Sequence, residues 1–141
     1  MFKKIFKTKK EENPKNENIL IMSLLIHAAK IDENYTENEK IIIKNAMINL
    51  KNLTIVEAEE LLKLAEKKEE ESNQIVEFTK EIKKYSMEFR LKIIEIIWKI
   101  IYSDGTNDNY ESNLIRRICG LLYISDKDSG IIKMKVKNSN K

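Results

Sequence analysis

The sequence predicts an all-α protein: a compact single domain of about seven helices, arranged as two similar helical-hairpin halves. Its 141 residues are enough for one hydrophobic core. Only three glycines and one proline occur, too few for the many turns of a β-sandwich. Apolar residues recur at helical spacing from Ile19 almost to the C-terminus, and the pattern of residues 24–50 returns 72 residues later.

Helical periodicity and capping signals define the expected helices. The segment Ile19–Ala28 is apolar nearly all round, which is typical of a buried helix. Thr54 with Glu57 forms a capping-box pattern at a helix start. The charged stretch Lys67–Glu71 is expected to be a solvent-exposed helix end. The expected helices cover about residues 17–30, 37–51, 55–71, 74–84, 86–102, 109–122 and 126–136.

The repeat consists of two copies of one pattern, in which a buried helix is followed by an acidic turn and an amphipathic helix. We expect the two helical hairpins to pack face to face with approximate two-fold symmetry, which buries the first and fifth helices together. The matched residues are Leu24–Ile26 with Ile96–Trp98, Asp32 with Asp104, Glu39 with Glu111, Ile43 with Ile115, and Ala46 with Ile118.

Basic residues gather at the two ends of the chain. Residues 1–10 contain five lysines and residues 133–141 contain four, with no acidic residue in either segment. The rest of the chain holds 17 basic and 23 acidic residues, although the whole carries a net charge of +3. We therefore predict a basic, disordered tail over 1–16, a helical domain over 17–136 and a basic tail over 137–141. An acidic folded surface argues against nucleic acid as a partner.

The N-terminal segment Met1–Lys10 has the composition for weak contact with a membrane surface. Phe2, Ile5 and Phe6 would enter the interface, while the neighbouring lysines would meet anionic lipid. The alternative is a disordered, solubilising end, which the shortness of the segment favours.

No other stretch predicts a membrane protein. The apolar run Ile19–Ala29 is too short to cross a bilayer, and the N-terminus lacks the apolar centre of a signal peptide. A cytoplasmic protein is expected, with membrane association as an option. Cys119, the one cysteine, is expected in the core, and His27 is expected to be a hydrogen-bonded core imidazole.

The two acidic turns carry residues that fit a helix start. Thr36 with Glu39, and Asp108 with Glu111, match the capping box, in which the first and fourth side chains satisfy unpaired backbone amides. Each such cap stabilises a helix by about 1 kcal/mol. On residue chemistry alone, turn stabilisation is favoured over metal binding.

Capping does not account for Asp32 and Asp104. Both follow a helix C-terminus, where the macrodipole disfavours a carboxylate, so a cation or backbone amides should compensate. An EF-hand is excluded because its glycine and final glutamate are missing. Oxygen donors without a nearby His or Cys suit Ca²⁺ or Mg²⁺, whereas the rival interpretation needs no cofactor. The candidate metal ligands are Asp32, Glu39, Asp104 and Glu111, with Asn34, Thr36, Thr106 and Asp108 as secondary ones.

With the repeat in view, residues 18–132 resemble the tellurite-resistance TerB-like family, most closely its small stand-alone members. The similar segments are LLIHAAKIDENYTENEK, EAEELLKLAE and RLKIIEIIWKIIYSDGTNDNYESNLIRRICGLLYISDKD. The family pattern is a helix that ends in Ala-Asp-Gly, with a glutamate seven residues after the aspartate, given twice. The two copies here read Ile31-Asp32-Glu33 with Glu39, and Ser103-Asp104-Gly105 with Glu111.

The resemblance implies an all-helical domain of two similar halves, acidic residues that bind divalent cations, and a role in tellurite and chemical-stress resistance. The same domain precedes the J domain in the co-chaperone DjlA, but the His-Pro-Asp motif is absent here. No triad spacing and no Gly-rich phosphate loop occurs, so we expect a non-enzymatic protein. The first hypothesis is a cation-binding stress-response module. The alternative is a metal-free helical scaffold that docks a protein partner; the oligomeric state stays open.

Overall fold

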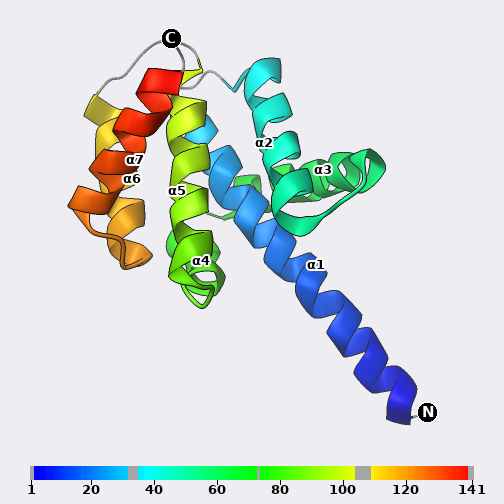
Figure 1. Ribbon diagram of the computed structural model, residues 1–141. Helices are drawn as coiled ribbons and strands as arrows, with labels where there is room; N and C mark the ends of the chain where they lie inside the picture. Colours follow the sequence, from blue (N-terminus) through cyan, green and yellow to red (C-terminus); the bar gives the residue numbers. More distant parts are fainter. Residues whose placement is uncertain (1, 32–34, 73, 104–108, 140–141) are drawn as a thin grey trace.

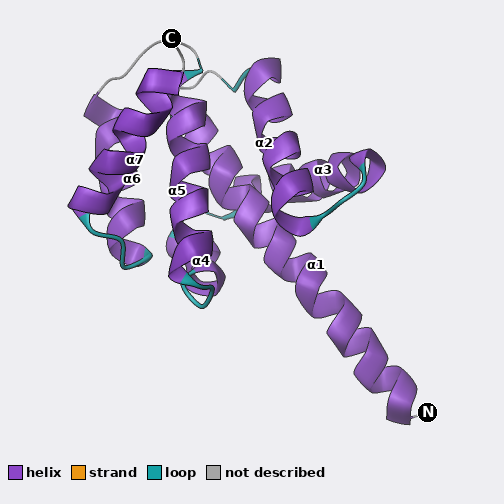
Figure 2. Ribbon diagram, viewed as in Figure 1, coloured by secondary structure: helices purple, strands orange, loops and turns teal. Residues whose placement is uncertain are grey.

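The computed structural model describes residues 2–31, 35–72, 74–103 and 109–139, with only the helical backbone described for 2–15 and 109–112. These residues form seven α-helices and no β-strand (Figures 1 and 2). The predicted all-α class is confirmed. The helices are α1 (Phe2–Ala29), α2 (Glu37–Lys51), α3 (Ile55–Glu71), α4 (Val76–Ile82), α5 (Met87–Tyr102), α6 (Asn109–Leu121) and α7 (Asp126–Ser139).

Hydroxyl side chains fix the first residues of α2 and α3 as the sequence predicts. The Glu39 backbone amide donates to the Thr36 hydroxyl (3.2 Å), and the Thr36 amide donates to the Glu39 carboxylate (2.8 Å). Glu57 and Thr54 form the same reciprocal pair, at 3.1 and 2.9 Å. Because a helix leaves its first amides without internal partners, these bonds define where α2 and α3 begin. Single serine caps open α5 and α7.

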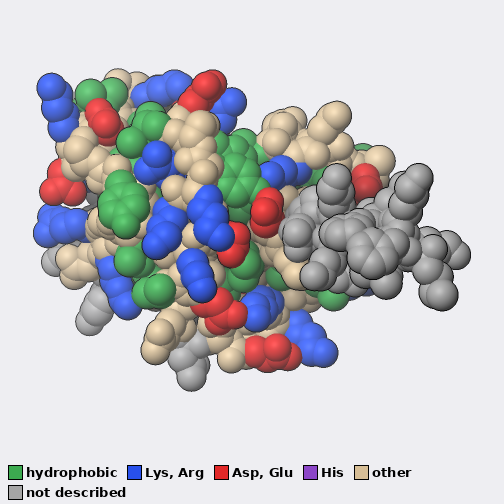
Figure 3. Space-filling model, turned by 90° about the horizontal axis from the view of Figure 1, so that it is seen from below, with side chains coloured by type: hydrophobic (Ala, Val, Ile, Leu, Met, Phe, Trp, Pro, Cys, Tyr) green, Lys and Arg blue, Asp and Glu red, His purple; other side chains and the backbone are tan. Residues whose placement is uncertain are grey.

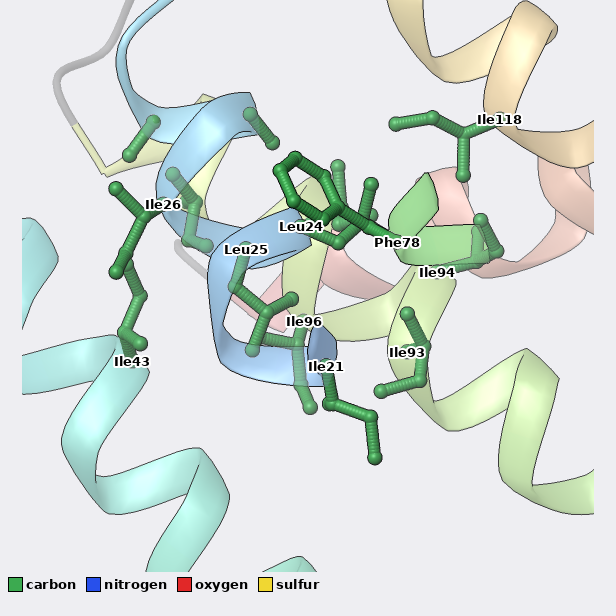
Figure 4. Close-up of a cluster of buried hydrophobic side chains, with 14 of the residues drawn as sticks. Ile21, Leu24, Leu25, Ile26, Ile43, Phe78, Ile93, Ile94, Ile96 and Ile118 are labelled. Carbon is green, nitrogen blue, oxygen red and sulfur yellow. The ribbon is translucent and has the colours of Figure 1, made fainter. Parts of the chain in front are cut away.

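Two helices, α1 and α5, form the centre of the hydrophobic core (Figure 4). Every residue of α1 from Ile21 to Ile26 is fully buried, so this segment is covered on all sides. In α5, the segment from Ile93 to Ile101 buries all but two of its residues. The predicted packing of these two apolar helices against each other is confirmed. Apolar side chains from the other helices complete the cluster, among them Ile43 of α2, Phe78 of α4 and Ile118 of α6.

The predicted repeat corresponds to two three-helix units, α1–α3 and α5–α7, with α4 between them in the chain. In each unit the third helix packs along the first. Asn52 and Tyr123 end the second helix of each unit in the same left-handed conformation, with φ of 56° and 58°. The amide after each of them bonds back five residues, Leu53 to the Ile48 carbonyl (3.2 Å) and Ile124 to the Cys119 carbonyl (2.9 Å). The repeat therefore continues beyond the segment in which the sequence shows it.

Each unit also joins its first and third helices by a buried polar contact. The Ser23 hydroxyl of α1 lies 3.2 Å from the Ala65 carbonyl of α3 and 2.6 Å from the Ile19 carbonyl. In the second unit, Trp98 Nε1 of α5 donates to the Ser129 hydroxyl of α7 (3.2 Å). These partners remove the free-energy cost of burying the polar groups, and they fix how the paired helices lie.

Three helices differ from the predicted ones by two or more residues at one or both ends. The predicted start of the first helix near residue 17 is wrong, because α1 continues back to Phe2 and extends beyond the other helices (Figure 1). Residues 2–12 contain neither glycine nor proline, and their Lys, Glu, Phe and Ile residues all tolerate a helix. α4 is shorter than expected because no side chain caps its start, and α7 continues to Ser139. The division into tails and a domain over 17–136 stays a prediction.

We predict that Tyr123→Gly stabilises the protein. A left-handed conformation costs a residue with a Cβ about 1 kcal/mol, and glycine avoids this cost. Tyr123 is 68% exposed, so its removal loses little burial. After allowance for the more flexible unfolded chain, the free energy of unfolding in urea should rise by about 0.5 kcal/mol. Tyr123→Phe should match the wild type, and a less stable glycine variant would contradict the prediction.

Candidate functional site

The four helix ends that flank the two acidic segments lie at the same end of the molecule. α1 and α5 end there, and α2 and α6 begin there (top of Figure 1). The structure thus brings together the helix ends that carry the predicted cation site, while the ligand geometry stays a prediction. Outside the described residues lie Asp32, Asn34, Asp104, Thr106 and Asp108, together with the side chain of Glu111.

Glu39 and Thr36 are the predicted site residues whose side chains the structure describes. Glu39 is 3% exposed. Its Oε1 accepts hydrogen bonds from the Thr36 backbone amide (2.8 Å) and the Thr36 hydroxyl (3.2 Å). The capping interpretation of this pair is therefore confirmed. Its role in metal binding stays a prediction.

Beside the first acidic turn, Glu69 of α3 binds two residues from the end of α1. The Glu69 side chain is 11% exposed; its Oε1 accepts a hydrogen bond from Lys30 Nζ at 2.8 Å. Its Oε2 lies 3.1 Å from Nδ1 of His27. Charge-assisted bonds of this kind compensate a carboxylate that has lost water. They hold the C-terminal ends of α1 and α3 together.

Tyr35, just before α2, lies against two lysines and several glutamates. The Nζ atoms of Lys30 and Lys40 are 5.7 and 5.0 Å from the centre of its ring. Lys40 also pairs with Glu66 at 3.7 Å and with Glu37 at 3.5 Å. Burial, followed by the Glu66 carboxylate, raises the pKa of Tyr35 above its ordinary value. The Tyr35 hydroxyl is therefore neutral at physiological pH, and glutamates carry the negative charge here.

The sequence interpretation missed Glu69 and placed His27 too deep. The stretch Lys67–Glu71 was expected to be solvent exposed, but Glu69 is buried. Its spacing was the signal, since Glu69 follows the buried Leu61 and Ala65 at intervals of four on one helix face. His27 is hydrogen-bonded as predicted, but its side chain is 30% exposed, so it lies at the edge of the core.

Other predictions about single residues are confirmed or stay open. Cys119 is buried as expected, and burial raises the pKa of its thiol. Within the described residues, no three His, Cys, Asp or Glu side chains are placed to hold a metal ion. Asp32, Asp104 and the side chain of Glu111 lie outside the described residues, so this result does not test the predicted cation site. No helix in this part of the chain is long and apolar enough to span a membrane.

Charges of both signs alternate on the face of the molecule opposite the acidic turns (Figure 3). The ion pairs of α3 and α4 include Lys68 with Glu77 at 2.6 Å and Lys84 with Glu81 at 3.4 Å. Exposed pairs like these contribute little to stability because water screens them. A nucleic-acid-binding surface typically carries clustered positive charge, whereas this face carries charges of both signs.

Together, two similar three-helix units with acidic turns at one end define a small all-helical domain of repeated architecture. A family model described as tellurite resistance protein TerB matches residues 18–134, which cover most of both units. No curated protein and no solved structure matches the chain. The chain belongs to the TerB family, as its sequence resemblance led us to expect.

We predict that Thr36→Ala destabilises the protein by about 1 kcal/mol, because the Glu39 amide at the start of α2 loses its cap. Thr36→Ser keeps a hydroxyl at the same place and should remain within a few tenths of a kcal/mol of the wild type. Urea unfolding of the three proteins, in the presence of EDTA, measures the difference. Equal stability of the alanine and serine variants would contradict the role of the hydroxyl.

Proposed function

We propose that this chain is a non-enzymatic TerB-family module of a tellurite or chemical-stress resistance system, and that it binds a divalent cation at its acidic turns. The observation that carries the proposal is that α1 and α5 end at the same end of the molecule (Figure 1). Helix C-termini bear partial negative charge, and here each is followed by an aspartate, Asp32 or Asp104. Oxygen ligands from such turns suit Ca²⁺ or Mg²⁺, either of which would offset this negative potential.

Charges beside the first acidic turn support the same proposal. Carboxylates outnumber ammonium groups there, which leaves a deficit of positive charge that a divalent ion would fill. The carboxylates are those of Glu37, Glu39, Glu66 and Glu69, and the ammonium groups are those of Lys30 and Lys40.

A metal-free scaffold that docks a protein partner is the second candidate. It is favoured by the observation that Glu39 already caps α2, while Lys30 and Lys40 already pair with glutamates at this turn. On this alternative, the acidic turns shape the helix ends and the function lies on an outer surface. Both candidates place the protein in the cytoplasm.

Divalent ions distinguish the two candidates. If the folded protein holds a site, ion at a hundredfold excess over Kd adds about 2.7 kcal/mol to the free energy of unfolding. For a chain of this length, that corresponds to roughly 5–10 °C in melting temperature. Asp104→Asn and Glu39→Gln should abolish the shift. Because glutamine also completes a capping box, Glu39→Gln removes a ligand charge and keeps the cap.

Thermal melting in EDTA and in millimolar Ca²⁺ or Mg²⁺ provides this measurement. Glu57→Gln makes the same change in the matching cap of α3, away from the acidic turns, and should keep the full shift. Absence of an ion-dependent shift in the wild type would contradict the cation proposal and favour the scaffold.

The N-terminal part of α1 supports a weaker interaction, contact of Met1–Lys10 with an anionic membrane surface. The helix reaches Phe2 and extends away from the other helices, as a surface-binding helix would (Figure 1). The lysines of this segment would supply the attraction to anionic headgroups. The module would then be cytoplasmic and associated with the membrane surface.

We expect the whole protein to sediment with phosphatidylserine-containing vesicles more than a version that lacks residues 1–12. Replacement of Lys3 and Lys4 by glutamine should weaken vesicle binding by about 1 kcal/mol for each lysine. The same replacement at Lys63 and Lys67 on α3 is the control and should leave binding unchanged. Equal sedimentation of the whole and shortened proteins would end the membrane proposal.

A further inference from the structure

One stripe of the central helix α5 stays open to solvent. Between Ile93 and Ile101, the residues that are not buried are Glu95 and Lys99, which lie four residues apart and therefore on one helix face. α7 packs on one side of α5 and α2 on the other (Figure 1). The stripe therefore lies in a groove between α2 and α7.

This α2/α5/α7 groove has an apolar floor. It consists of two adjoining hollows of about 450 and 440 Å³ that share Ile42 and Lys99. On α2, Ile42, Ala46 and Leu50 follow one another at intervals of four, so their side chains form a continuous apolar strip along the groove. Ile96 of α5 and Val136 of α7 extend this floor.

The rim of the groove is basic. Lys92 and Lys99 of α5 and Lys135 of α7 line it, and Glu95 is the one acidic residue among the described lining residues, which leaves an excess of two positive charges. Glu95 lies between two of these lysines, 3.1 Å from Lys135 Nζ and 3.4 Å from Lys99 Nζ. The groove is thus positive within a chain whose middle is acidic overall.

We propose that the α2/α5/α7 groove binds an acidic, amphipathic helix of a partner protein. Apolar side chains on one face of such a helix would cover the floor, and carboxylates beside them would meet Lys92, Lys99 and Lys135. The stretch of α5 from Lys92 to Tyr102 is about 15 Å long, which matches about three turns of a bound helix. A nucleic acid would meet the lysines, but Tyr102 is the one aromatic residue among the described lining residues, and its ring already stacks on Trp98, so a row of bases would find little stacking surface.

This inference rests on the second candidate function, protein docking, and it names the docking site and the chemistry of the partner. The probe is a fluorescently labelled synthetic helix of about 16 residues, long enough to be partly helical, with leucine on one face and glutamate elsewhere. Two comparison peptides replace all glutamates by lysine or all leucines by serine. Fluorescence anisotropy with the full chain in EDTA should show saturable binding of the leucine–glutamate peptide alone.

Variants of the groove locate the binding. Lys99→Glu reverses a rim charge, and Ala46→Glu places a carboxylate in the floor; each should weaken binding by about tenfold or more. Lys63→Glu makes the same charge change on an exposed part of α3 that does not line the groove, and should stay within about twofold of the wild type. Circular dichroism and melting temperature check that each variant is folded. If Ala46→Glu does not fold, Lys99→Glu still tests the groove, because Lys99 is exposed.

The proposal is overturned if the leucine–glutamate peptide does not bind, if either comparison peptide binds as tightly, or if Lys99→Glu has no more effect than Lys63→Glu. Tighter binding of a single-stranded oligonucleotide at the same residues would overturn it in favour of nucleic acid. Because EDTA removes divalent ions, the peptide experiment does not depend on cation binding. If the peptide does not bind, only the groove proposal is contradicted. If the melting temperature shows no ion-dependent shift, only the cation proposal is contradicted.

Discussion

The burial of α1 and α5 against each other is the constraint on which the rest of the fold depends. A helix turns through 100° per residue, so a segment buried at six consecutive positions, as α1 is from Ile21 to Ile26, has no side that can face water. The shorter helices must therefore surround this pair. None of them would be stable alone, since helices of their length gain most of their stability from packing. Ser23, the polar residue within the buried segment, has its partners in the backbone of α1 and α3.

The same packing determines where chemistry is available. Because α1 and α5 end together, the acidic turns that follow them lie at one end of the molecule, where the helix termini, Glu39 and the lysine-paired glutamates of α3 also gather (Figure 1). Because α2 and α7 cover opposite sides of α5, a stripe of that helix stays exposed in the groove between them, which has an apolar floor and lysines along its rim. The cation site and the docking groove are thus two consequences of covering one apolar helix pair with short helices.

Local signals explain which parts of this structure the sequence predicts. The starts of α2 and α3 follow from the capping boxes at Thr36 and Thr54, in which all partners lie within four residues. The core of α5 follows from its periodicity. Parts that depend on distant contacts were missed: Glu69 meets Lys30 across 39 residues, and Lys135 meets Glu95 across 40. The start of α1 was missed because Pro14 and the asparagines around it indicate a helix boundary, although Phe2, Ile5 and Phe6 already recur at helical spacing.

Native-state hydrogen exchange tests the central claim most directly, because it measures the free energy at which each helix opens. If α1 and α5 form one shared core, their amides over 21–29 and 93–101 exchange only through global unfolding, and they approach one common free energy as denaturant is raised. The amides of α4 and of the N-terminal part of α1 exchange through smaller openings. Exchange of α1 or α5 through a separate opening of lower free energy would show that the two units have independent cores, and would contradict the claim.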